Sequence, residues 1–244
     1  MASKREKAAE RAERAAQLRR EQQAAERRRT LLAVGGGVLA VLVLLGGTLA
    51  YTLSQDSTSD IVAESAGESA YGVTIGPDDA PHEIVIYEDF LCPFCGQLEA
   101  ATRDDLAELA EAGNVQVEYR PYELLSGIGD YSRRATNAFA VVLEAEGPEV
   151  AKVFHDLLFE EQPSESGPFP SDEDLIDLAV EAGADEDAVT DGIVGLSQAD
   201  WVDGATQAAR DAGIQGTPTV LLDGEVLQPA SVDDLADQMI SGVE

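Results

Sequence analysis

The sequence predicts an α/β domain that follows a single N-terminal transmembrane helix. A strand–helix–strand pattern over residues 83–119 and a second group of strands at 219–227 predict the α/β class. Between them, residues 131–212 have mostly helical patterns and form a helical insertion. Residues 31–53 contain no charged side chain, which predicts the transmembrane helix.

A basic segment opens the chain. Residues 1–30 contain ten Lys or Arg residues and five Asp or Glu residues, and residues 1–29 lack proline and glycine. We expect a solvated basic tail on the cytoplasmic side of the membrane. A weaker functional interpretation is attraction to anionic lipid, worth about 1 kcal/mol for each basic residue near the surface.

Residues 31–53 are long enough to cross a membrane, because a bilayer core of about 30 Å needs about 20 residues of helix. Three arginines at 27–29 directly precede this stretch, and acidic residues follow it. The positive-inside rule places the N-terminus in the cytoplasm and the rest of the chain outside it. A cleaved signal peptide is the alternative, but its apolar region would span about 7–15 residues and end at a small-residue site, which residues 48–50 match poorly. We therefore expect an uncleaved, single-pass anchor in the cell membrane.

The next segment, residues 54–70, is small, polar and acidic. We expect a flexible acidic linker whose reach is on the order of 20–25 Å. The folded domain is then expected to occupy residues 71–244. No cysteine follows the membrane span directly, which excludes a lipoprotein anchor.

Acidic side chains dominate the part of the chain after the basic tail. Residues 31–244 carry 42 Asp or Glu residues and six Lys or Arg residues. This negative charge repels phosphate groups, so nucleic acid is excluded as a partner of the domain. A soluble surface explains the charge most simply, and adaptation to a salty habitat is the alternative.

Strands and helices alternate along the domain. Residues 83–87 form a continuous apolar run and residues 115–119 alternate between apolar and polar, two patterns typical of strands. The helix at 93–112 between them makes a parallel crossover, ends at a glycine, and has an apolar stripe consisting of Leu98, Ala101, Leu106 and Leu109. The remaining expected elements are the strands 72–76, 219–222 and 225–227 and a closing helix at 232–240.

Turn and capping residues divide the insertion and the final hairpin. Gly147-Pro148 and Gly167-Pro168 interrupt the helical pattern of residues 131–212. The sequence Ser171 to Asp174 precedes an apolar run and is typical of a helix start. Asp223-Gly224 predicts a tight hairpin turn between the last two strands.

The chain has two cysteines, Cys92 and Cys95, three positions apart. A disulfide between them closes a very small loop and stabilises the fold little, so its role is chemical. Cys92 follows a strand and opens a helix, where N–H groups and the helix dipole lower a thiol pKa to about 3.5–7. We expect an exposed Cys92 to attack, a deeper Cys95 to resolve the mixed disulfide, and Pro93 to fit the first helical turn.

A zinc site is the main alternative for this Cys-x-x-Cys pair. Structural zinc needs four ligands, and the only other candidates are His82, before a strand, and His155, inside the helical insertion. A copper-carrying domain would also need a nearby histidine. The sequence therefore favours a redox-active disulfide, with no metal and no separate cofactor.

A second motif, Gly216-Thr217-Pro218-Thr219, directly precedes the strand at 219–222. Together with Asp89-Phe90-Leu91-Cys92-Pro93-Phe94-Cys95 after a strand, it resembles the DsbA-type branch of the thioredoxin family over about residues 71–241. The resemblance implies a thioredoxin-like fold with a helical insertion. It also implies that Pro218 is cis and faces the dithiol, and that Thr217 pairs with the backbone of a bound substrate.

Two departures from that family matter. The family often has a buried carboxylate six residues before the first cysteine, and here that residue is Ile86; Glu88 and Asp89 lie nearby, without an assigned role. Strongly oxidising members carry a histidine between the cysteines, where this chain has Phe94. Because phenylalanine cannot donate a hydrogen bond to a thiolate, we expect a potential below the upper end of the family range of about −270 to −120 mV.

The resemblance implies an enzyme outside the cytoplasm that oxidises cysteine-containing secreted or membrane proteins and exchanges electrons with a membrane-bound redox partner. Two alternatives stay open. The same site could work as a disulfide reductase or isomerase, although isomerases of this family usually carry a separate dimerisation domain, for which the linker is too short. The domain could also be a tethered, non-enzymatic module that binds a metal or a peptide.

Overall fold

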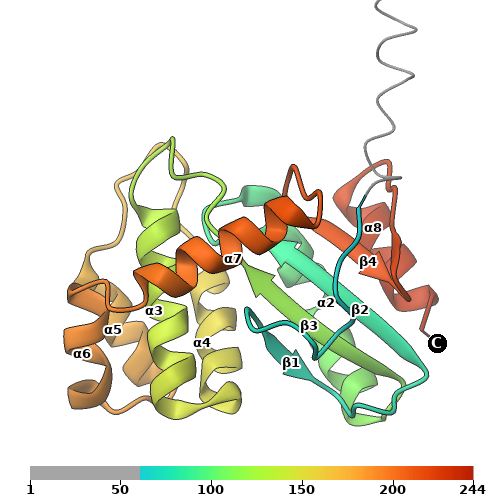
Figure 1. Ribbon diagram of the computed structural model, residues 1–244, viewed down its shortest axis with the longest axis horizontal. Coiled ribbons are helices and arrows are strands. Elements are labelled where there is room, and N and C mark those ends of the chain that lie inside the picture. Colours follow the sequence, from blue (N-terminus) through green and yellow to red (C-terminus); the bar gives the residue numbers. More distant parts are fainter. Residues whose placement is uncertain (1–60, 244) are drawn as a thin grey trace, which may run out of the picture. The chain divides into compact units, whose positions relative to one another are not determined.

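Five strands form one mixed sheet in the order β1-β3-β2-β4-β5 (Figure 1). The computed structural model describes residues 61–243. The strands are β1 (Val73–Ile75), β2 (His82–Glu88), β3 (Val115–Pro121), β4 (Thr219–Leu222) and β5 (Glu225–Val226). β2 and β3 are parallel, whereas β1, β4 and β5 each run antiparallel to their neighbours. The expected strand order along the chain and the parallel central pair are confirmed.

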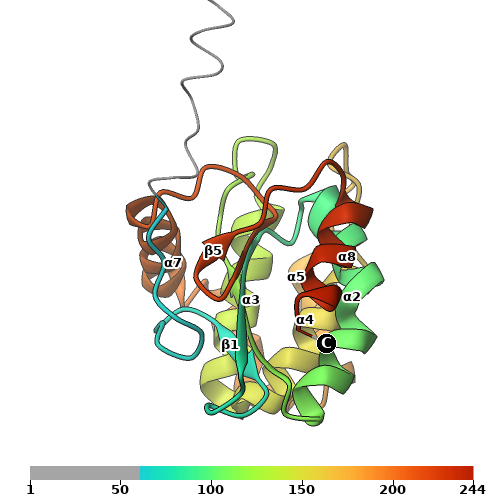
Figure 2. The same ribbon diagram turned by 90° about the vertical axis from the view of Figure 1, so that its right-hand side faces the viewer.

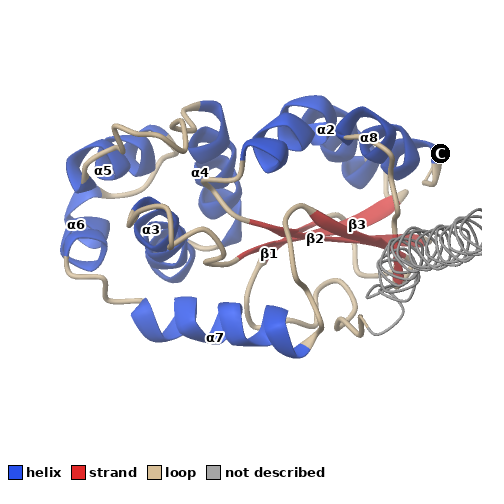
Figure 3. Ribbon diagram, turned by 90° about the horizontal axis from the view of Figure 1, so that it is seen from above, coloured by secondary structure: helices blue, strands red, loops and turns tan. Residues whose placement is uncertain are grey.

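Helices cover both faces of this sheet. α2 (Pro93–Glu111) and α8 (Val232–Ser241) lie on one face, and α7 (Ala199–Asp211) crosses the other (Figures 2 and 3). The central strand β2 is buried on both sides, and alternation divides its side chains between two apolar clusters. Ile84 and Ile86 join the core that contains the buried side of α2, and Val85 and Tyr87 join the core beneath α7.

The helical insertion packs beside the sheet (Figure 1). Its helices are α3 (Tyr131–Glu146), α4 (Pro148–Glu160), α5 (Asp172–Glu181), α6 (Glu186–Val194) and α7. Gly147 separates α3 from α4 with a φ of 86°, a conformation that favours glycine. Ser171 and Asp174 form the capping box that starts α5. The expected insertion at about 131–212 and its division are confirmed.

The buried face of α2 differs from the expected stripe. Leu98 and Leu106 are buried as expected, but Ala101 is exposed. The buried residues of α2 instead include Glu99 and Thr102. The spacing of apolar residues did not predict this face, because two of its buried side chains are polar.

Residues 61–67, which we name the strap, are docked on the domain. Ala66 is buried in the core beneath α7. The polar bonds that hold the strap join Val62 N to Ala212 O (3.0 Å), Ala66 N to Glu83 Oε2 (3.2 Å), Gly67 N to Glu118 Oε2 (2.8 Å) and Arg120 Nη2 to Ser65 O (2.8 Å). The expected flexible linker over 54–70 is therefore wrong for the strap, and the domain starts earlier than residue 71.

The predicted cytoplasmic tail (1–30) and transmembrane helix (31–53) lie outside the described residues. Within residues 61–243, no helix is both long and apolar enough to cross a membrane.

Candidate active site

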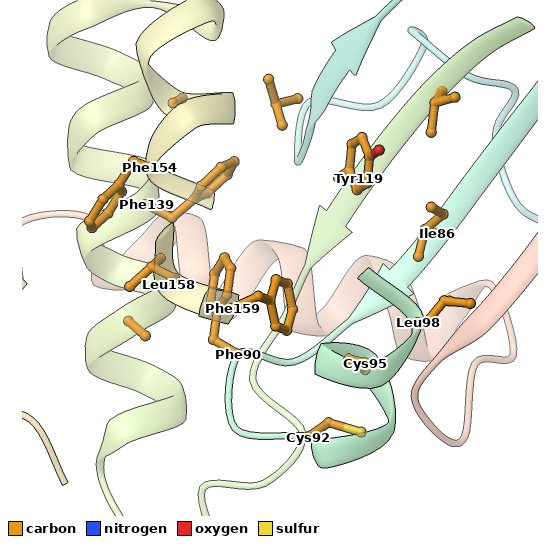
Figure 4. Packing of buried hydrophobic residues seen from close by; sticks show 14 of the residues in the cluster. Ile86, Phe90, Cys92, Cys95, Leu98, Tyr119, Phe139, Phe154, Leu158 and Phe159 are labelled. Carbon is orange, nitrogen blue, oxygen red and sulfur yellow. The ribbon is translucent and has the colours of Figure 1, made fainter. Parts of the chain in front are cut away.

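The dithiol lies where β2 leads into α2 (Figure 4). Cys92 is the N-cap residue of α2, Pro93 occupies the first helical position, and Cys95 lies within the first turn. The carbonyl of Cys92 accepts hydrogen bonds from the N–H groups of Cys95 (3.1 Å) and Gly96 (3.2 Å). The structure therefore brings both cysteines to the helix start that the sequence predicted, and both are free thiols.

Cys92 is more enclosed than expected. Cys92 is 4% exposed and Cys95 is 2% exposed. The prediction that the attacking cysteine is exposed is therefore wrong. The Cys92 thiol donates a hydrogen bond to the Thr217 carbonyl at 3.3 Å, and this loop covers it. Cys92 is covered by a residue 125 positions away, and the spacing of motifs along the sequence does not reveal this contact.

The pKa of Cys92 is nevertheless lowered, from 9.0 to about 6. A hydrogen bond from the Cys95 side chain lowers this pKa most, while burial works in the opposite direction. Hydrogen bonds with the Thr217 side chain and with the backbone of Cys95 and Phe94 lower the pKa further. The expected thiolate-stabilising helix end thus contributes, but the second thiol contributes more.

Cys95 behaves in the opposite way. Burial raises its pKa well above 9.0, and its hydrogen bond and charge interaction with Cys92, together with the Glu88 carboxylate, raise the pKa further. Cys92 is therefore the thiolate at neutral pH and Cys95 is the proton-bearing partner. This division matches the attacking and resolving roles proposed for the two cysteines.

The proline loop faces the dithiol. The Thr217–Pro218 peptide bond is cis, as the resemblance implies, and the Thr217 carbonyl is the hydrogen-bond partner of Cys92. The Thr219 hydroxyl bonds to the Gly216 carbonyl at 2.7 Å and holds the loop at the start of β4. Thr217 and Pro218 therefore lie beside Cys92, where a substrate bound at Cys92 would meet them.

Exposed apolar side chains belong to the dithiol turn and to a loop that is hydrogen-bonded to the residues before it. Phe94, between the cysteines, is 57% exposed. The loop after β3 exposes Leu124 and Ile128, and Asp89 anchors this loop next to the dithiol turn through Leu124 N at 2.8 Å. Exposed apolar side chains beside a reactive thiol suit contact with unfolded polypeptide.

Asp89 organises the turn before Cys92. This fully buried carboxylate accepts hydrogen bonds from the N–H groups of Leu91, Leu124 and Leu125, each at 2.8 Å, and from the Ser132 hydroxyl at 2.6 Å. It thereby joins the dithiol turn to the loop after β3 and to α3. Its position directly after a buried strand was the signal in the sequence, but its partners outside its own turn lie 35 to 43 positions away.

Gln162, just after α4, also supports the dithiol turn. Its Nε2 donates to the carbonyls of Phe90 (3.0 Å) and Cys92 (2.9 Å). Gly96 makes room for this side chain, because a Cβ there would lie 2.5 Å from Gln162 Oε1. Sequence reasoning missed this contact, because nothing in the sequence distinguishes Gln162 from an exposed glutamine.

A cluster of buried charges lies beneath α2. Glu88 continues the alternation of β2, so its side chain lies on the same face as Ile86, and it is 2% exposed. His155 Nε2 lies 2.5 Å from Glu88 Oε1, and His155 Nδ1 lies 2.9 Å from Asp156 Oδ1. A buried carboxylate therefore lies on the same face of β2 as Ile86, two residues later.

The same cluster contains a candidate metal site. Glu99, His155 and Asp156 place one ligand atom each within 4.8 Å of one another. However, Lys152 Nζ bonds to Asp156 and lies 3.6 Å from Glu99 Oε1. Because this ammonium group already neutralises the carboxylates, the residues fit an internal ion-pair network better than a metal ion.

Known proteins share this architecture. The profile of the family described as Thioredoxin matches residues 68–240. The probable disulfide bond formation protein D of Bacillus cereus is 22% identical over 197 residues, which cover 78% of this chain and 87% of that protein.

Two solved structures from Mycobacterium tuberculosis are also similar. The reduced disulfide bond oxidoreductase DsbG is 30% identical with a TM-score of 0.59, over 71% of this chain and 89% of that chain. Reduced DsbA is 27% identical with a TM-score of 0.57, over 71% and 99%. The fold, the matched profile and these relatives agree: the chain belongs to the thioredoxin family, with a helical region added to the thioredoxin-like fold, and is a protein disulfide oxidoreductase.

Proposed function

We propose that the protein is a dithiol oxidase that introduces disulfide bonds into cysteine-containing secreted or membrane proteins through Cys92-Pro93-Phe94-Cys95. The observation that supports this direction is the lowered pKa of Cys92, about 6, beside the raised pKa of Cys95. A stable Cys92 thiolate favours the reduced form of the protein. A protein whose reduced form is stabilised is a stronger oxidant of its substrates.

The reaction begins from the Cys92–Cys95 disulfide. A substrate thiolate attacks the sulfur of Cys92, the Cys92–Cys95 bond breaks, and its electron pair leaves on Cys95. A second substrate thiolate then attacks the substrate sulfur of the mixed disulfide and releases Cys92 as a thiolate, which its low pKa favours. The substrate loses two electrons and the protein gains two. Thr217 and Pro218 would hold the substrate backbone, and Phe94 would contact its apolar side chains.

The proposal places the domain outside the cytoplasm, on the anchor at residues 31–53. A membrane-bound partner would reoxidise the dithiol after each cycle. Support comes from the arginines at 27–29 and the uncharged span that follows them. Protease added to intact, wall-free cells should remove the domain and leave a short membrane-bound fragment; a protected domain would contradict this orientation.

The decisive experiment is a reduction potential measured against glutathione, together with oxidation of a reduced, unfolded test protein. We expect a potential above about −270 mV, the value of thioredoxin, and below about −120 mV. Oxidised protein should form disulfides in the test protein, and a Cys92→Ser variant should form none. A potential at or below that of thioredoxin would contradict the oxidase direction.

A reductase or isomerase that uses the same site is the second candidate. The observation that favours it is Phe94, because its side chain offers no hydrogen bond to the Cys92 thiolate and cannot stabilise the reduced form in that way. A non-enzymatic module that binds a metal or a peptide is the third. That function would persist in cells that carry Cys92→Ser, whereas the oxidase function would be lost.

A further inference from the structure

The helical insertion contains a groove whose residues take no part in the disulfide exchange described so far. We name it the insertion groove. It has a volume of about 510 Å³ and lies between α5 and the loop that joins α4 to α5. Figure 1 shows this loop at the same end of the insertion as the loop after β3. The groove combines exposed carboxylates with half-buried apolar side chains.

The rim of the insertion groove is acidic. Asp174, Asp177 and Glu181 lie on one face of α5, and Glu161, directly after α4, adds a fourth carboxylate. All four residues are exposed. Among the residues that the structure describes, none of the four forms an ion pair. Carboxylates are ionised at neutral pH, so the rim presents negative charge that no basic side chain of the domain neutralises.

The floor of the groove is apolar and preformed. Leu178 lies on the same face of α5 as the rim, and Phe169 and three prolines of the loop line the other wall. Phe169 stacks on Tyr131 with ring centroids 6.1 Å apart. Arg134, whose charge is already paired with a carboxylate, donates through Nη2 to the Pro170 carbonyl at 2.6 Å. Because the loop is held in place, little ordering is needed when a ligand binds.

The groove begins next to the dithiol turn. Gln162 lies between Glu161 and Pro163, which both line the groove. Its Nε2 donates to the carbonyls of Phe90 (3.0 Å) and Cys92 (2.9 Å). The same residue therefore contacts the dithiol turn while its two neighbours in the chain line the groove. A substrate bound at Cys92 meets the groove if its chain continues past Gln162.

The insertion and the proline loop lie on different sides of the dithiol. Cys92 follows β2, which β3 and β4 flank on opposite sides. Thr217 and Pro218 directly precede β4. The insertion packs beside the other edge of the sheet, where α4 contacts β1. A polypeptide that is held at Thr217 and reacts at Cys92 therefore has one arm that leads toward the insertion.

The spacing of the rim carboxylates selects an extended ligand over a metal ion. Neighbouring positions on one helix face are about 5–6 Å apart, and the seven residues from Asp174 to Glu181 extend about 10 Å along the axis. Within residues 61–243, the ligand atoms close enough to share a metal ion belong to Glu99, His155 and Asp156, outside the groove. An extended polypeptide places every second side chain on one side, about 7 Å apart, which fits the rim.

We propose that the insertion groove binds a basic and apolar segment of the substrate polypeptide, adjacent to the cysteine that reacts at Cys92. This inference rests on the proposed disulfide-exchange function. Lysine or arginine side chains of the substrate pair with the rim carboxylates, and apolar side chains between them pack on Phe169 and Leu178. Docking raises the effective concentration of the substrate thiol at Cys92, so exchange is faster although the chemistry of the dithiol is unchanged.

The first test compares dithiol peptides as substrates of the oxidised, full-length wild-type protein. Each peptide has the same two cysteines and a short tail of alternating Arg and Leu, alternating Arg and Ser, or alternating Glu and Leu. The Arg-Leu peptide should react at least about threefold faster than the Arg-Ser peptide, because only its apolar side chains bury surface on the floor. The Glu-Leu peptide should react most slowly. Equal rates for the Arg-Leu and Arg-Ser peptides would overturn the proposal.

The position of the tail is part of the same test. Because the groove lies on one side of Cys92, the Arg-Leu tail should increase the rate when it is attached on one side of the peptide cysteines and not on the other. An equal increase from either side would contradict the location of the binding site.

The second test neutralises the rim in the full-length protein. Asp177→Asn combined with Glu181→Gln removes two charges from the groove. Asp104→Asn combined with Glu111→Gln is the control, because it removes two exposed charges of α2 that form no ion pair among the described residues. For each protein, the rate with the Arg-Leu peptide is divided by its rate with a small uncharged dithiol. This ratio should fall at least about threefold in the groove variant and stay at the wild-type value in the control.

The control separates the groove from the field of the whole protein. Both double variants change the net charge by the same amount, so a long-range field would lower their ratios alike. Equal ratios in the two variants would therefore overturn the proposal.

Failure of the groove and failure of the proposed function are distinguishable. A wild-type protein that oxidises no dithiol would contradict the function itself. The groove is then tested without chemistry, by NMR titration of the full-length protein with an Arg-Leu peptide whose cysteines are replaced by serine. Backbone amide signals of α5 and of residues 164–167 should shift, and those of α8 should not. If the signals of α5 stay in place up to millimolar peptide, the proposal is wrong.

Discussion

At the scale of single residues, the chemistry of Cys92 depends on its immediate neighbours. The Cys95 side chain makes the largest contribution to lowering the Cys92 pKa, and Thr217 contributes less. We therefore predict that Cys95→Ala raises the Cys92 pKa well above 6 and that Thr217→Val raises it by a smaller amount. The rate of alkylation by iodoacetamide as a function of pH measures both.

Thr219→Val is the control for the threonine variant, because the Thr219 hydroxyl bonds to the Gly216 carbonyl and not to Cys92. It should leave the Cys92 pKa unchanged. A Cys92→Ser protein should show no thiolate up to pH 9, since burial raises the pKa of Cys95 well above that value. If Cys92 has the same pKa in the wild type and in Cys95→Ala, the Cys95 side chain is not the main cause of the lowered pKa.

The lowered pKa of Cys92 also predicts how stability depends on pH. Below pH 6 the thiol is protonated in the folded and unfolded protein, so it adds nothing. Between about 6 and 9 the folded protein holds the thiolate and the unfolded protein the thiol, so folding gains stability as pH rises. The melting temperature of the reduced protein should therefore rise relative to that of the oxidised protein over this range. If the two melting temperatures differ by the same amount at every pH in this range, the folded, reduced protein does not hold Cys92 as a thiolate.

Asp89 supports the site through structure rather than reaction. Replacing it with Asn removes one of its acceptor oxygens and turns an amide toward the N–H groups and the hydroxyl that it now binds. We predict that Asp89→Asn lowers the free energy of unfolding by about 3 kcal/mol or more, since hydrogen bonds to a charged group are worth about 1.5–3 kcal/mol each. Urea unfolding measures this. Asp78→Asn, an exposed carboxylate with one hydrogen bond to Gln116, should change stability far less.

At the scale of elements, the strap extends the domain toward the N-terminus. It lies against the ends of β3 and α7, and Arg120 and Glu118 hold its backbone. We predict that deleting residues 1–67 lowers the free energy of unfolding by about 2–4 kcal/mol relative to deleting residues 1–60, at about 1 kcal/mol for each hydrogen bond lost. Deletion of residues 1–60, which keeps the strap, is the control. Equal urea midpoints for the two proteins would show that the strap contributes nothing.

At the scale of the whole molecule, the negative charge of the chain predicts a preference among substrates. The formal net charge is −31, and Lys152 and five arginines are the basic residues after the tail. We predict that oxidised protein reacts faster with a basic dithiol peptide than with an acidic one of equal thiol pKa, because the field of the protein attracts the first. The ratio of rates should fall toward one between low salt and about 1 M salt, where the screening length drops to about 3 Å. A ratio unaffected by salt would point to local contacts instead.

The sequence was informative wherever a pattern is local. The continuous apolar run of β2, the alternation in β3, the capping box at Ser171 and the turn at Asp223-Gly224 each reflect interactions within a few residues, and the structure contains all four elements. The position of Cys92 at the start of α2 follows from the same kind of signal. Where side chains or backbone groups meet partners distant along the chain, as in the strap and the buried face of α2, the expectations were wrong.

The sequence by itself determined the order of strands and helices, the dithiol at a helix start and the proline motif before β4, because short-range periodicity, caps and turns encode them. The tertiary structure alone decided that Thr217 covers Cys92, that Asp89 and Gln162 hold the dithiol turn, and that His155 from the insertion meets Glu88 beneath Cys95. These contacts join residues 67 to 125 positions apart, except for Asp89, whose partners outside its own turn are 35 to 43 positions away. Folding brings them together through burial in a shared core, and no local pattern records which distant polar groups that core pairs.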